Sequence, residues 1–548
     1  MVDLSSVETA LRLLGDRSNV SVPEPAELRR TAEQFATRTE FGNFNFSTMV
    51  KNRSAGVTVY IGSETVRQRA LNPRQQEIVT NAPNTIEKVL RYLESAPLVR
   101  VNRNMGDNTQ FSPHCSCFVS VHRPEMIRLA YMWGQTLFEP RPDASGPQEY
   151  LVYIPEWQEK DRQALVFPEI GVTFVLGSDY FGETKKGFLR KAMWFAKQEG
   201  MLGLHAGSKI VRARERDGNL RRYGVLIFGL TATGKTTHTC HDHGLSEDGE
   251  GIDILQDDIV MLRADGSALG TEDGFYLKTE GVDPESQPLI HKAAISEDTV
   301  FENVMVDYQG NVDFNDGTLT GNGRGIMKRG DLRPFITDSI DLPPISELDA
   351  LIFLFITRRN TIVPLCSKLN AAQAAAHFML GESIESTGGD PKRAGESIRS
   401  VGTNPFLIGS EADEGNWLYS FLQEHGHRVQ AYLLNTGGVG EVVERTDTGE
   451  KKLIRPALRP WIPGSAALIR GIVKGTVEWV DDPAWDTQVA VSVPDFDLSE
   501  FEVGNFYDQS EVDCMTEELR NERIKWLEQF PTLEPAIAEA IKVKGGAV

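Results

Sequence analysis

Residues 223–237 read Tyr-Gly-Val-Leu-Ile-Phe-Gly-Leu-Thr-Ala-Thr-Gly-Lys-Thr-Thr. The apolar run 223–228 predicts a strand, and the spacing G-x-x-x-x-G-K-[ST] that follows it is typical of a phosphate-binding loop at the start of a helix. Gly229 and Gly234 allow the backbone to turn so that several N–H groups face one anion. The positive end of the following helix adds to that attraction. The stretch therefore predicts an α/β domain that binds a nucleotide.

Two side chains of this loop have predicted roles of their own. Lys235 can reach the β- and γ-phosphates, and the Thr236 hydroxyl can bind a divalent metal. A strand–turn–helix corner without a ligand is the alternative, but the apolar strand before the loop favours the nucleotide. The predicted nucleotide-binding residues are Gly229, Leu230, Thr231, Ala232, Thr233, Gly234, Lys235, Thr236 and Thr237.

Length and charge restrict the class of protein. At 548 residues the chain is too long for one simple core, so two or more domains are expected. The net charge of −21 argues against a nucleic-acid partner. The apolar stretch 350–356 is too short to span a bilayer, so no membrane partner is expected. Because the first residues do not resemble a signal peptide and only five cysteines occur, the expected location is the cytoplasm, as a monomer or a small homo-oligomer.

Apolar periodicity and turn residues divide the chain into two expected domains, 1–202 with mixed α/β structure and 203–548 with the phosphate loop. A mobile loop is expected near 381–403. The expected strands are 57–61, 98–101, 117–121, 151–154, 172–176, 225–228, 252–255, 350–356 and 431–434. The expected helices are 7–14, 27–35, 85–93, 124–133, 369–380 and 516–530.

An acidic pair follows the predicted strand 252–255. Asp257 and Asp258 lie 22 and 23 residues after Lys235, beyond a plausible intervening helix. Carboxylates at a strand end suit Mg²⁺ or Mn²⁺, which prefer oxygen ligands. A solvated acidic turn is the alternative, and the position relative to the phosphate loop favours the metal.

A second group of polar residues precedes the loop. Lys185 and Lys186 occur together in Tyr-Phe-Gly-Glu-Thr-Lys-Lys-Gly at 180–187, in a chain with only 20 lysines. His205 follows 19 residues after Lys186. An ordinary solvated corner for the lysines and a structural role for the histidine are the alternatives. The segments His-Cys-Ser-Cys at 114–117 and His-Thr-Cys-His-Asp-His at 238–243 lack the paired spacing of a structural zinc site, so ordinary loop and helix residues are expected there.

Taken in order, these motifs resemble those of ATP-dependent phosphoenolpyruvate carboxykinase. The resemblance extends from about 175 to 440. It implies a two-domain α/β fold, with an N-terminal substrate-binding domain and a C-terminal nucleotide-binding domain. The matching segments are Y-x-G-x-x-K-K-G at 180–187, the phosphate loop, the pair 257–258, G-F-Y-L-K at 274–278, F-E-N-V at 301–304, V-D-F-N-D-G at 312–317, N-G-R at 322–324 and N-T-G-G at 435–438.

The resemblance implies conversion of oxaloacetate and ATP to phosphoenolpyruvate, ADP and CO₂, in gluconeogenesis. Lys186, as a neutral amine, His205 and Asp258 would bind Mn²⁺, and Thr236 would bind the Mg²⁺ of the nucleotide. Neighbouring Lys185 would lower the pKa of Lys186. The remaining implied roles are charge neutralisation on the γ-phosphate by Lys235, Arg324 and Lys278, and binding of the carboxylic acid by Tyr180, Lys186, Arg53 and Arg324.

Some residues depart from the family pattern. The third glycine of the family's phosphate loop is Ala232 here, and the match around Arg53 is poor. Extra acidic and glycine residues precede Asp257, and the adenine-side motif after Gly437 is not recognisable, so the preference for ATP over GTP depends mainly on the phosphate loop. Two other functions stay open, a related phosphate-loop kinase acting on a protein serine and a nucleotide-binding regulator without catalysis.

Overall fold

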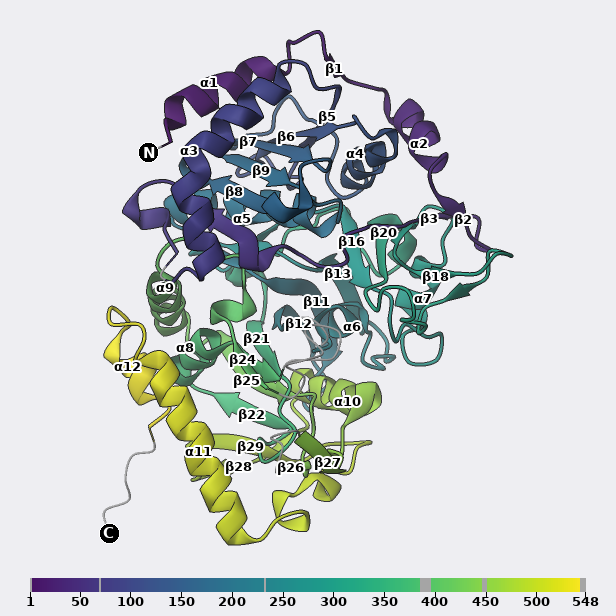
Figure 1. Cartoon of the computed structure of the whole chain (residues 1–548). Helices are drawn as coiled ribbons and strands as arrows, with labels where there is room; N and C mark the ends of the chain where they lie inside the picture. The colour runs from purple at the N-terminus through teal and green to yellow at the C-terminus, as the bar shows by residue number, and fades with distance from the viewer. Residues whose placement is uncertain (1, 69, 231–232, 385–395, 446–450, 543–548) are drawn as a thin grey trace. The chain divides into compact units, whose positions relative to one another are not determined.

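The computed structural model describes residues 2–68, 70–230, 233–384, 396–445 and 451–542. Thr231 and Ala232 of the predicted phosphate loop lie outside the described residues, as does 385–395 of the loop predicted near 381–403. The chain forms two compact units, and the predicted roles of 1–202 and 203–548 as substrate-binding and nucleotide-binding domains stay predictions. The first unit is Met1–Gly203, Leu269–Pro334 and Phe406–Ser410, and the second is Leu204–Ala268, Phe335–Pro405 and Glu411–Val548 (Figure 1).

The first unit contains a seven-stranded mixed sheet with helices on both faces. The helices of the first unit are α1 (Leu4–Leu14), α2 (Pro25–Glu33), α3 (Pro73–Leu93), α4 (Ile127–Gly134), α5 (Gly182–Gln198) and α7 (Pro288–Ala294). The strand order is β1 (Val20–Ser21), β5 (Leu98–Asn104), β6 (His114–Ser120), β7 (Gln148–Ile154), β9 (Val172–Leu176), β8 (Gln163–Phe167) and β4 (Thr58–Tyr60).

Side chains alternate across this sheet, as strand geometry requires. Val152 and Ile154 of β7 belong to the apolar core shared with α1 and α3. Leu151 points to the opposite face, where a Cβ on Gly187 of α5 would come within 2.4 Å of its Cδ1 atom. The glycine after the lysine pair therefore allows α5 to lie close against the sheet.

A second, five-stranded sheet of the first unit carries several predicted site residues. Its order is β16 (Gly274–Lys278), β20 (Arg324–Lys328), β17 (Val300–Glu302), β3 (Phe44–Phe46) and β2 (Thr37–Arg38). β16 and β20 are antiparallel, and Lys278 and Arg324 are directly paired across them. A short hairpin follows, formed by β18 (Met305–Val306) and β19 (Val312–Asp313).

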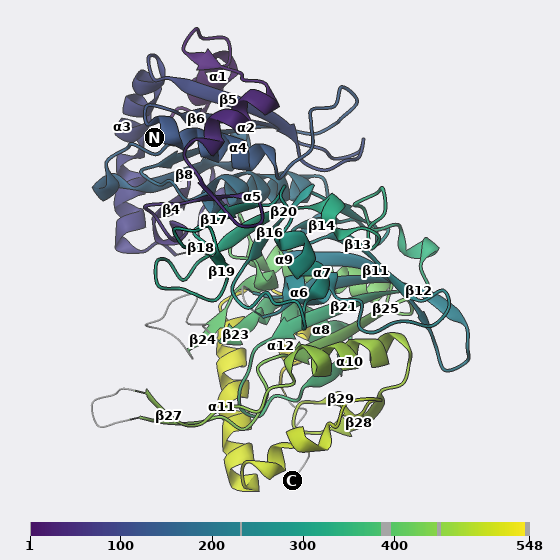
Figure 2. The same cartoon turned by 90° about the vertical axis from the view of Figure 1, so that its right-hand side faces the viewer.

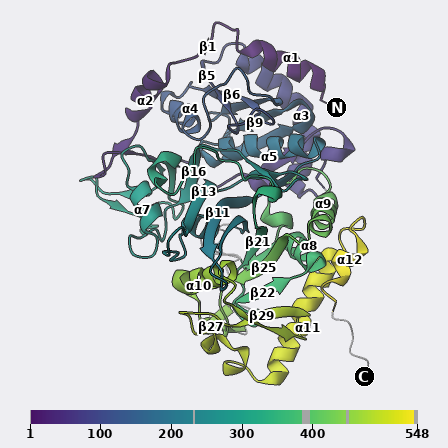
Figure 3. The ribbon, with the colours of Figure 1, turned by 180° about the vertical axis from the view of Figure 1, so that it is seen from behind.

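The second unit has an eight-stranded sheet between two layers of helices. The order is β13 (Gly251–Gln256), β11 (Ala206–Arg214), β12 (Leu220–Phe228), β21 (Ala350–Thr357), β25 (Val429–Asn435), β22 (Cys366–Leu369), β29 (Thr487–Ser492) and β28 (Glu478–Asp482). Figures 1 and 3 show α10 (Trp461–Val473) on one side of this sheet and α8 (Ala371–Leu380) on the other.

The remaining elements are short or peripheral. Figure 2 shows α11 (Gln509–Leu527) as a long helix at the edge of the second unit. The other helices are α6 (Lys235–Cys240), α9 (Glu411–Glu424) and α12 (Pro535–Glu539). Two strand pairs are β23 (Glu382–Ile384) with β24 (Ser397–Arg399) and β26 (Val442–Arg445) with β27 (Lys451–Arg455). The remaining strands are β10 (Leu202–Leu204), β14 (Val260–Leu262) and β15 (Ala268–Gly270). No helix among the described residues combines the length and the apolar character needed to cross a membrane.

The predicted mixed α/β fold is confirmed, and several helices differ from the sequence-based prediction, with α9 and α10 among those not expected. α3 begins at Pro73, and α11 at Gln509, well before the predicted starts at 85 and 516. Both starts have a capping box, from Asn72 and Asp508, which satisfies the first N–H groups of the helix. The lysine pair lies in α5 rather than in the corner that was the alternative.

Candidate functional site

The phosphate loop is built in the second unit as the sequence predicts. β12 ends at Phe228, α6 begins at Lys235, and Gly234 between them has a φ of 105°. A left-handed φ of this kind favours glycine, which explains the second glycine of the motif. The loop is fastened by the Thr233 hydroxyl, which donates to the Leu230 carbonyl at 2.8 Å, and by the Thr436 hydroxyl, which donates to the Thr233 carbonyl at 2.9 Å.

Three predicted residues of the second unit meet at one carboxylate oxygen. The Lys235 Nζ atom lies 2.6 Å from Asp258 Oδ1, and His205 Nε2 lies 3.0 Å from the same oxygen. Asp258 follows the end of β13, and His205 directly precedes β11, the neighbouring strand. All three residues are at most 9% exposed, so their charges interact with little solvent screening.

The histidine and the carboxylate fit a divalent cation. His205 Nδ1 lies 2.6 Å from the Thr403 carbonyl, which can only accept, so Nδ1 carries a proton, and in the neutral ring the lone pair for a metal would be on Nε2. Two adjacent ligands of an octahedral ion with bonds of about 2.1 Å are separated by about 3.0 Å, which is the separation of Nε2 and Asp258 Oδ1. A metal-binding histidine usually has such a second hydrogen bond.

Lys186, the third predicted ligand, belongs to the first unit. It lies in the first turns of α5, and its Nζ atom is 4.7 Å from the centroid of the Phe406 ring. The guanidinium carbon of Arg53 lies 4.7 Å from the same centroid. The structure thus brings Lys186 and Arg53 to one aromatic ring of the first unit, while the metal site shared with His205 and Asp258 stays a prediction.

Lys185, the other lysine of the pair, has a carboxylate partner. Its Nζ atom lies 2.7 Å from Glu272 Oε2, and both side chains are 1% exposed. Its positive charge is therefore partly compensated, which weakens the effect that Lys185 was predicted to have on Lys186.

The tyrosine of the predicted substrate site belongs to a polar cluster in the first unit. The Tyr180 hydroxyl lies 3.3 Å from the Tyr276 hydroxyl and accepts a hydrogen bond of 3.3 Å from the Asn322 amide. The Arg324 guanidinium carbon lies 5.7 Å from the centroid of the Tyr276 ring. Lys278, the partner of Arg324 across the strands, forms an ion pair with Glu280.

Sequence reasoning gave no site role to several residues of these clusters, among them Glu272, Tyr276 and Phe406. Tyr276 could have been found, because alternation along β16 places it on the same face as Lys278. Glu272 and Phe406 make their contacts with residues distant in sequence, and no local pattern indicates those contacts.

The segments 114–117 and 238–243, which were considered as zinc sites, do not form one among the described residues. All five cysteines are thiols without a disulfide, and Cys115 and Cys117 are buried in β6. His243 Nε2 accepts a 2.6 Å hydrogen bond from Lys209. No group of three or more His, Cys, Asp and Glu side chains among the described residues has the arrangement of a metal site.

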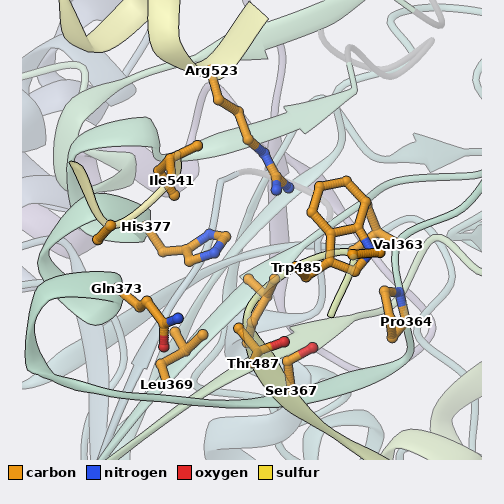
Figure 4. A pocket seen from close by; sticks show the side chains of 13 residues that line it. Val363, Pro364, Ser367, Leu369, Gln373, His377, Trp485, Thr487, Arg523 and Ile541 are labelled. Carbon is orange, nitrogen blue, oxygen red and sulfur yellow. The ribbon is translucent and has the colours of Figure 1, made fainter. Parts of the chain in front are cut away.

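A small cavity lies apart from these clusters in the second unit. Figure 4 shows His377 of α8 and Arg523 of α11 on its wall. Its volume of about 20 Å³ has room for one water molecule and not for a substrate. None of the predicted site residues lines it.

Comparisons with known proteins identify the family of the chain. A family model described as phosphoenolpyruvate carboxykinase matches residues 17–499. An Aeropyrum pernix protein named phosphoenolpyruvate carboxykinase (ATP) is 36% identical over 365 residues, which are 66% of this chain and 68% of that protein. The glycosomal phosphoenolpyruvate carboxykinase (ATP) of Trypanosoma cruzi is 27% identical over 57% of this chain, and a Salinibacter ruber relative of the same name, numbered 1, is 28% identical over 56%. These two alignments span only 60% and 56% of the relatives' own lengths.

The matched region includes both units and every predicted site residue. Because the family model covers most of the chain and the Aeropyrum pernix protein is matched over more than two thirds of its length, this chain belongs to the ATP-dependent phosphoenolpyruvate carboxykinase family.

Proposed function

We propose that this protein converts oxaloacetate and ATP to phosphoenolpyruvate, ADP and CO₂. The observation that carries the proposal is the meeting of Lys235 and His205 at Asp258, directly beside the phosphate loop. Family membership supports the same reaction. A cytoplasmic location, a role in gluconeogenesis and a monomeric or small homo-oligomeric state belong to the proposal as well.

The reaction has two chemical steps. The C–C bond to the departing carboxylate breaks, CO₂ leaves, and the electron pair stays on the remaining three-carbon acid as an enolate. The enolate oxygen then forms a bond to the γ-phosphorus while the bond from phosphorus to the β,γ-bridging oxygen breaks. No general base is needed for the second step because the nucleophile is already an anion, and cations that spread the charge are what the site must provide.

The first unit would bind the small acid. Arg53 lies with Lys186 at one aromatic ring, and the positive charge of Arg53 suits a carboxylate of oxaloacetate. Tyr180 would lie against the acid, held by the bond to its hydroxyl from the Asn322 amide. Arg324 would neutralise charge on the transferred group, with Lys278 beside it.

The second unit would bind the nucleotide. Backbone N–H groups of 229–234 and the start of α6 would hold the phosphates, and Lys235 would turn from Asp258 to the γ-phosphate. His205, Asp258 and Lys186 would hold Mn²⁺, and Thr236 would hold Mg²⁺. Bound metal ions would supply positive charge to the enolate oxygen and to the phosphates.

The two alternative functions are less well supported. A kinase acting on a protein serine would need a general base for the hydroxyl, whereas the Asp258 carboxylate is already in an ion pair with Lys235. A regulator without catalysis would not need the buried cation clusters that both units contain.

Phosphoenolpyruvate formation from oxaloacetate, followed with ATP and with GTP, tests the proposal. Turnover is expected with ATP and Mn²⁺, with CO₂ and ADP produced in equal amounts. Decarboxylation without phosphoenolpyruvate, or nucleotide binding without either product, would contradict it.

A further inference from the structure

One arginine in the first unit connects two buried carboxylates. Arg128, the second residue of α4, is 2% exposed. Its Nη2 atom lies 3.1 Å from Asp179 Oδ2 and donates a 2.5 Å hydrogen bond to the Asp179 carbonyl. Its Nη1 atom lies 3.3 Å from Glu302 Oε1. Asp179 is 3% exposed and Glu302 is completely buried, and each has its ion pair within the described residues with Arg128.

Asp179 holds the segment that carries Arg53. Its Oδ2 atom accepts a 2.9 Å hydrogen bond from the Met49 amide, and Oδ1 accepts a 2.8 Å bond from the Val50 amide. These amides lie in a segment without regular secondary structure, three and four residues before Arg53. A carboxylate that accepts two successive backbone amides therefore fixes the path of the chain as it approaches Arg53.

Glu302 holds the tyrosine cluster in the same way. Its Oε1 atom accepts a 3.0 Å bond from the Phe181 amide, and Oε2 accepts a 3.2 Å bond from the Tyr276 hydroxyl. Phe181 directly follows Tyr180, and the hydroxyls of Tyr180 and Tyr276 are 3.3 Å apart. Burial raises the pKa of Glu302, and the positive charge of Arg128 opposes that rise.

The guanidinium geometry is essential to this arrangement. Nη1 and Nη2 are fixed in one plane, so they can bond Glu302 and Asp179 at the same time, whereas a lysine ammonium is a single point charge on a flexible stem. Without the arginine, two buried carboxylates would face each other without a cation, which is strongly unfavourable.

We propose that Arg128 is a positioning residue for the carboxylic-acid substrate, which sets the segment before Arg53 and the Tyr180–Tyr276 pair in one fixed arrangement. It does this through Asp179 and Glu302 and does not itself touch the substrate. The inference rests on the proposed function, because it concerns the site for oxaloacetate. It predicts that changes at Arg128 affect the acid and leave nucleotide binding in the second unit unchanged.

The first experiment uses Arg128→Lys, with Arg103→Lys as the matched control. Arg103 is also buried in the first unit and bonds Glu139 and the Gly134 carbonyl. For Arg128→Lys the KM for oxaloacetate is expected to rise at least about tenfold, since one of two charged contacts is lost. The ATP dissociation constant should stay within about twofold of wild type, and Arg103→Lys should leave both values unchanged.

Three further variants separate a positioning role from an effect on folding. Asp179→Asn should raise the oxaloacetate KM because it weakens the bonds that hold the segment before Arg53. Glu302→Gln should raise it because it weakens the bonds that hold the Tyr180–Tyr276 pair. Arg128→Ala, if it folds, should recover part of its oxaloacetate affinity when guanidinium is added at millimolar concentration, well below denaturing levels.

The outcomes distinguish a failure of the positioning role of Arg128 from a failure of the proposed function. Lower thermal stability of Arg128→Lys with an unchanged oxaloacetate KM would overturn the positioning role. A parallel loss of ATP affinity would overturn it as well. Absence of oxaloacetate turnover in the wild-type protein would instead overturn the proposed function.

Discussion

Lys191 in the first unit and Lys209 in the second are both completely buried, yet they are stabilised differently. Lys191 lies on α5, five residues after Lys186, and donates hydrogen bonds to the Tyr150 and Gly171 carbonyls. Its Nζ atom also lies 3.5 Å from the carboxyl group of Glu149. This lysine connects α5 to the sheet of the first unit.

Lys209 lies on β11, four residues after His205, and has no carboxylate within ion-pair distance among the described residues. It donates hydrogen bonds to the His238 and His241 carbonyls, at 2.5 and 3.0 Å, and to His243 Nε2 at 2.6 Å. The two carbonyls belong to the C-terminal end of α6, whose first residue is Lys235.

The difference indicates what each buried charge stabilises. A cation at the C-terminal end of a helix interacts favourably with the helix dipole. Lys209 therefore acts on the helix that begins at the phosphate loop, whereas Lys191 acts on the packing of α5. Alternation along β11 places Gly207 and Lys209 on one face, and a Cβ on Gly207 would come within 2.1 Å of the Thr239 hydroxyl of α6, so this face of the strand supports the phosphate-loop helix.

The largest expected effect on activity is at Lys235, the first residue of the helix that Lys209 supports. Lys235→Ala should abolish phosphoryl transfer, at least about 10³-fold, because several kcal/mol of transition-state stabilisation are lost. Phosphoenolpyruvate formation measures it, and circular dichroism checks the fold. Lys368→Ala, an exposed lysine of the same unit, is the control. Near-normal turnover of a folded Lys235→Ala variant would show that the loop does not bind the reacting phosphate.

The proposed metal site should give the next largest effect. His205→Gln should weaken activation by Mn²⁺ about 10–100-fold while the ATP dissociation constant changes little. The Lys186→Arg variant should also lose activation by Mn²⁺, because guanidinium keeps its proton and has no lone pair for a metal. Titration of activity with Mn²⁺ tests both, with Lys197→Arg near the end of α5 as control. Normal Mn²⁺ activation of Lys186→Arg would exclude the lysine as a ligand.

Much of the fold and of the second-unit site could be predicted from sequence. The phosphate loop depends on local spacing, and Asp258 follows a predicted strand, so both positions were accessible to pattern reasoning. The meeting of His205 with Asp258 was implied by the family resemblance and follows from the pairing of β11 with β13.

The remaining contacts depend on tertiary structure. Glu302 reaches Arg128 over 174 residues, and Glu272 reaches Lys185 over 87 residues. Glu302 lies in the F-E-N-V segment of the family resemblance, but that segment does not indicate its contact with Arg128, and Glu272 lies in no such segment. The early starts of α3 and α11 were missed for a different reason, since their capping boxes are short signals outside the apolar periodicity that was used.

Lys209 and Lys191 should differ in a smaller effect, on ATP affinity and on thermal stability. Lys209→Met should raise the ATP dissociation constant about tenfold, equivalent to about 1.4 kcal/mol, with the oxaloacetate KM unchanged. Lys191→Met should lower the unfolding temperature and leave ATP binding unchanged. Fluorescence titration with a labelled nucleotide measures the first, and thermal unfolding the second. Equal changes of ATP affinity in both variants would contradict the assignment of separate roles.

The smallest effect is a pair of opposite pH dependences. Burial lowers the pKa of Lys209 to about 7 and raises the pKa of Glu149 to about 8. Between pH 7 and the ordinary lysine range, the unfolded chain holds a proton at Lys209 that the folded chain has lost, so this group makes stability rise with pH. Between the ordinary glutamate range and pH 8, the folded chain holds the extra proton at Glu149, so stability falls as pH rises.

Each slope is at most about 1.4 kcal/mol per pH unit. Unfolding temperatures of wild type, Lys209→Met and Glu149→Gln, measured from pH 5.5 to 9, test both signs. The difference between wild type and Glu149→Gln should fall up to pH 8, and the difference between wild type and Lys209→Met should rise above pH 7. Slopes of the same sign would mean that one of the two charges is compensated by a group other than those facing it here.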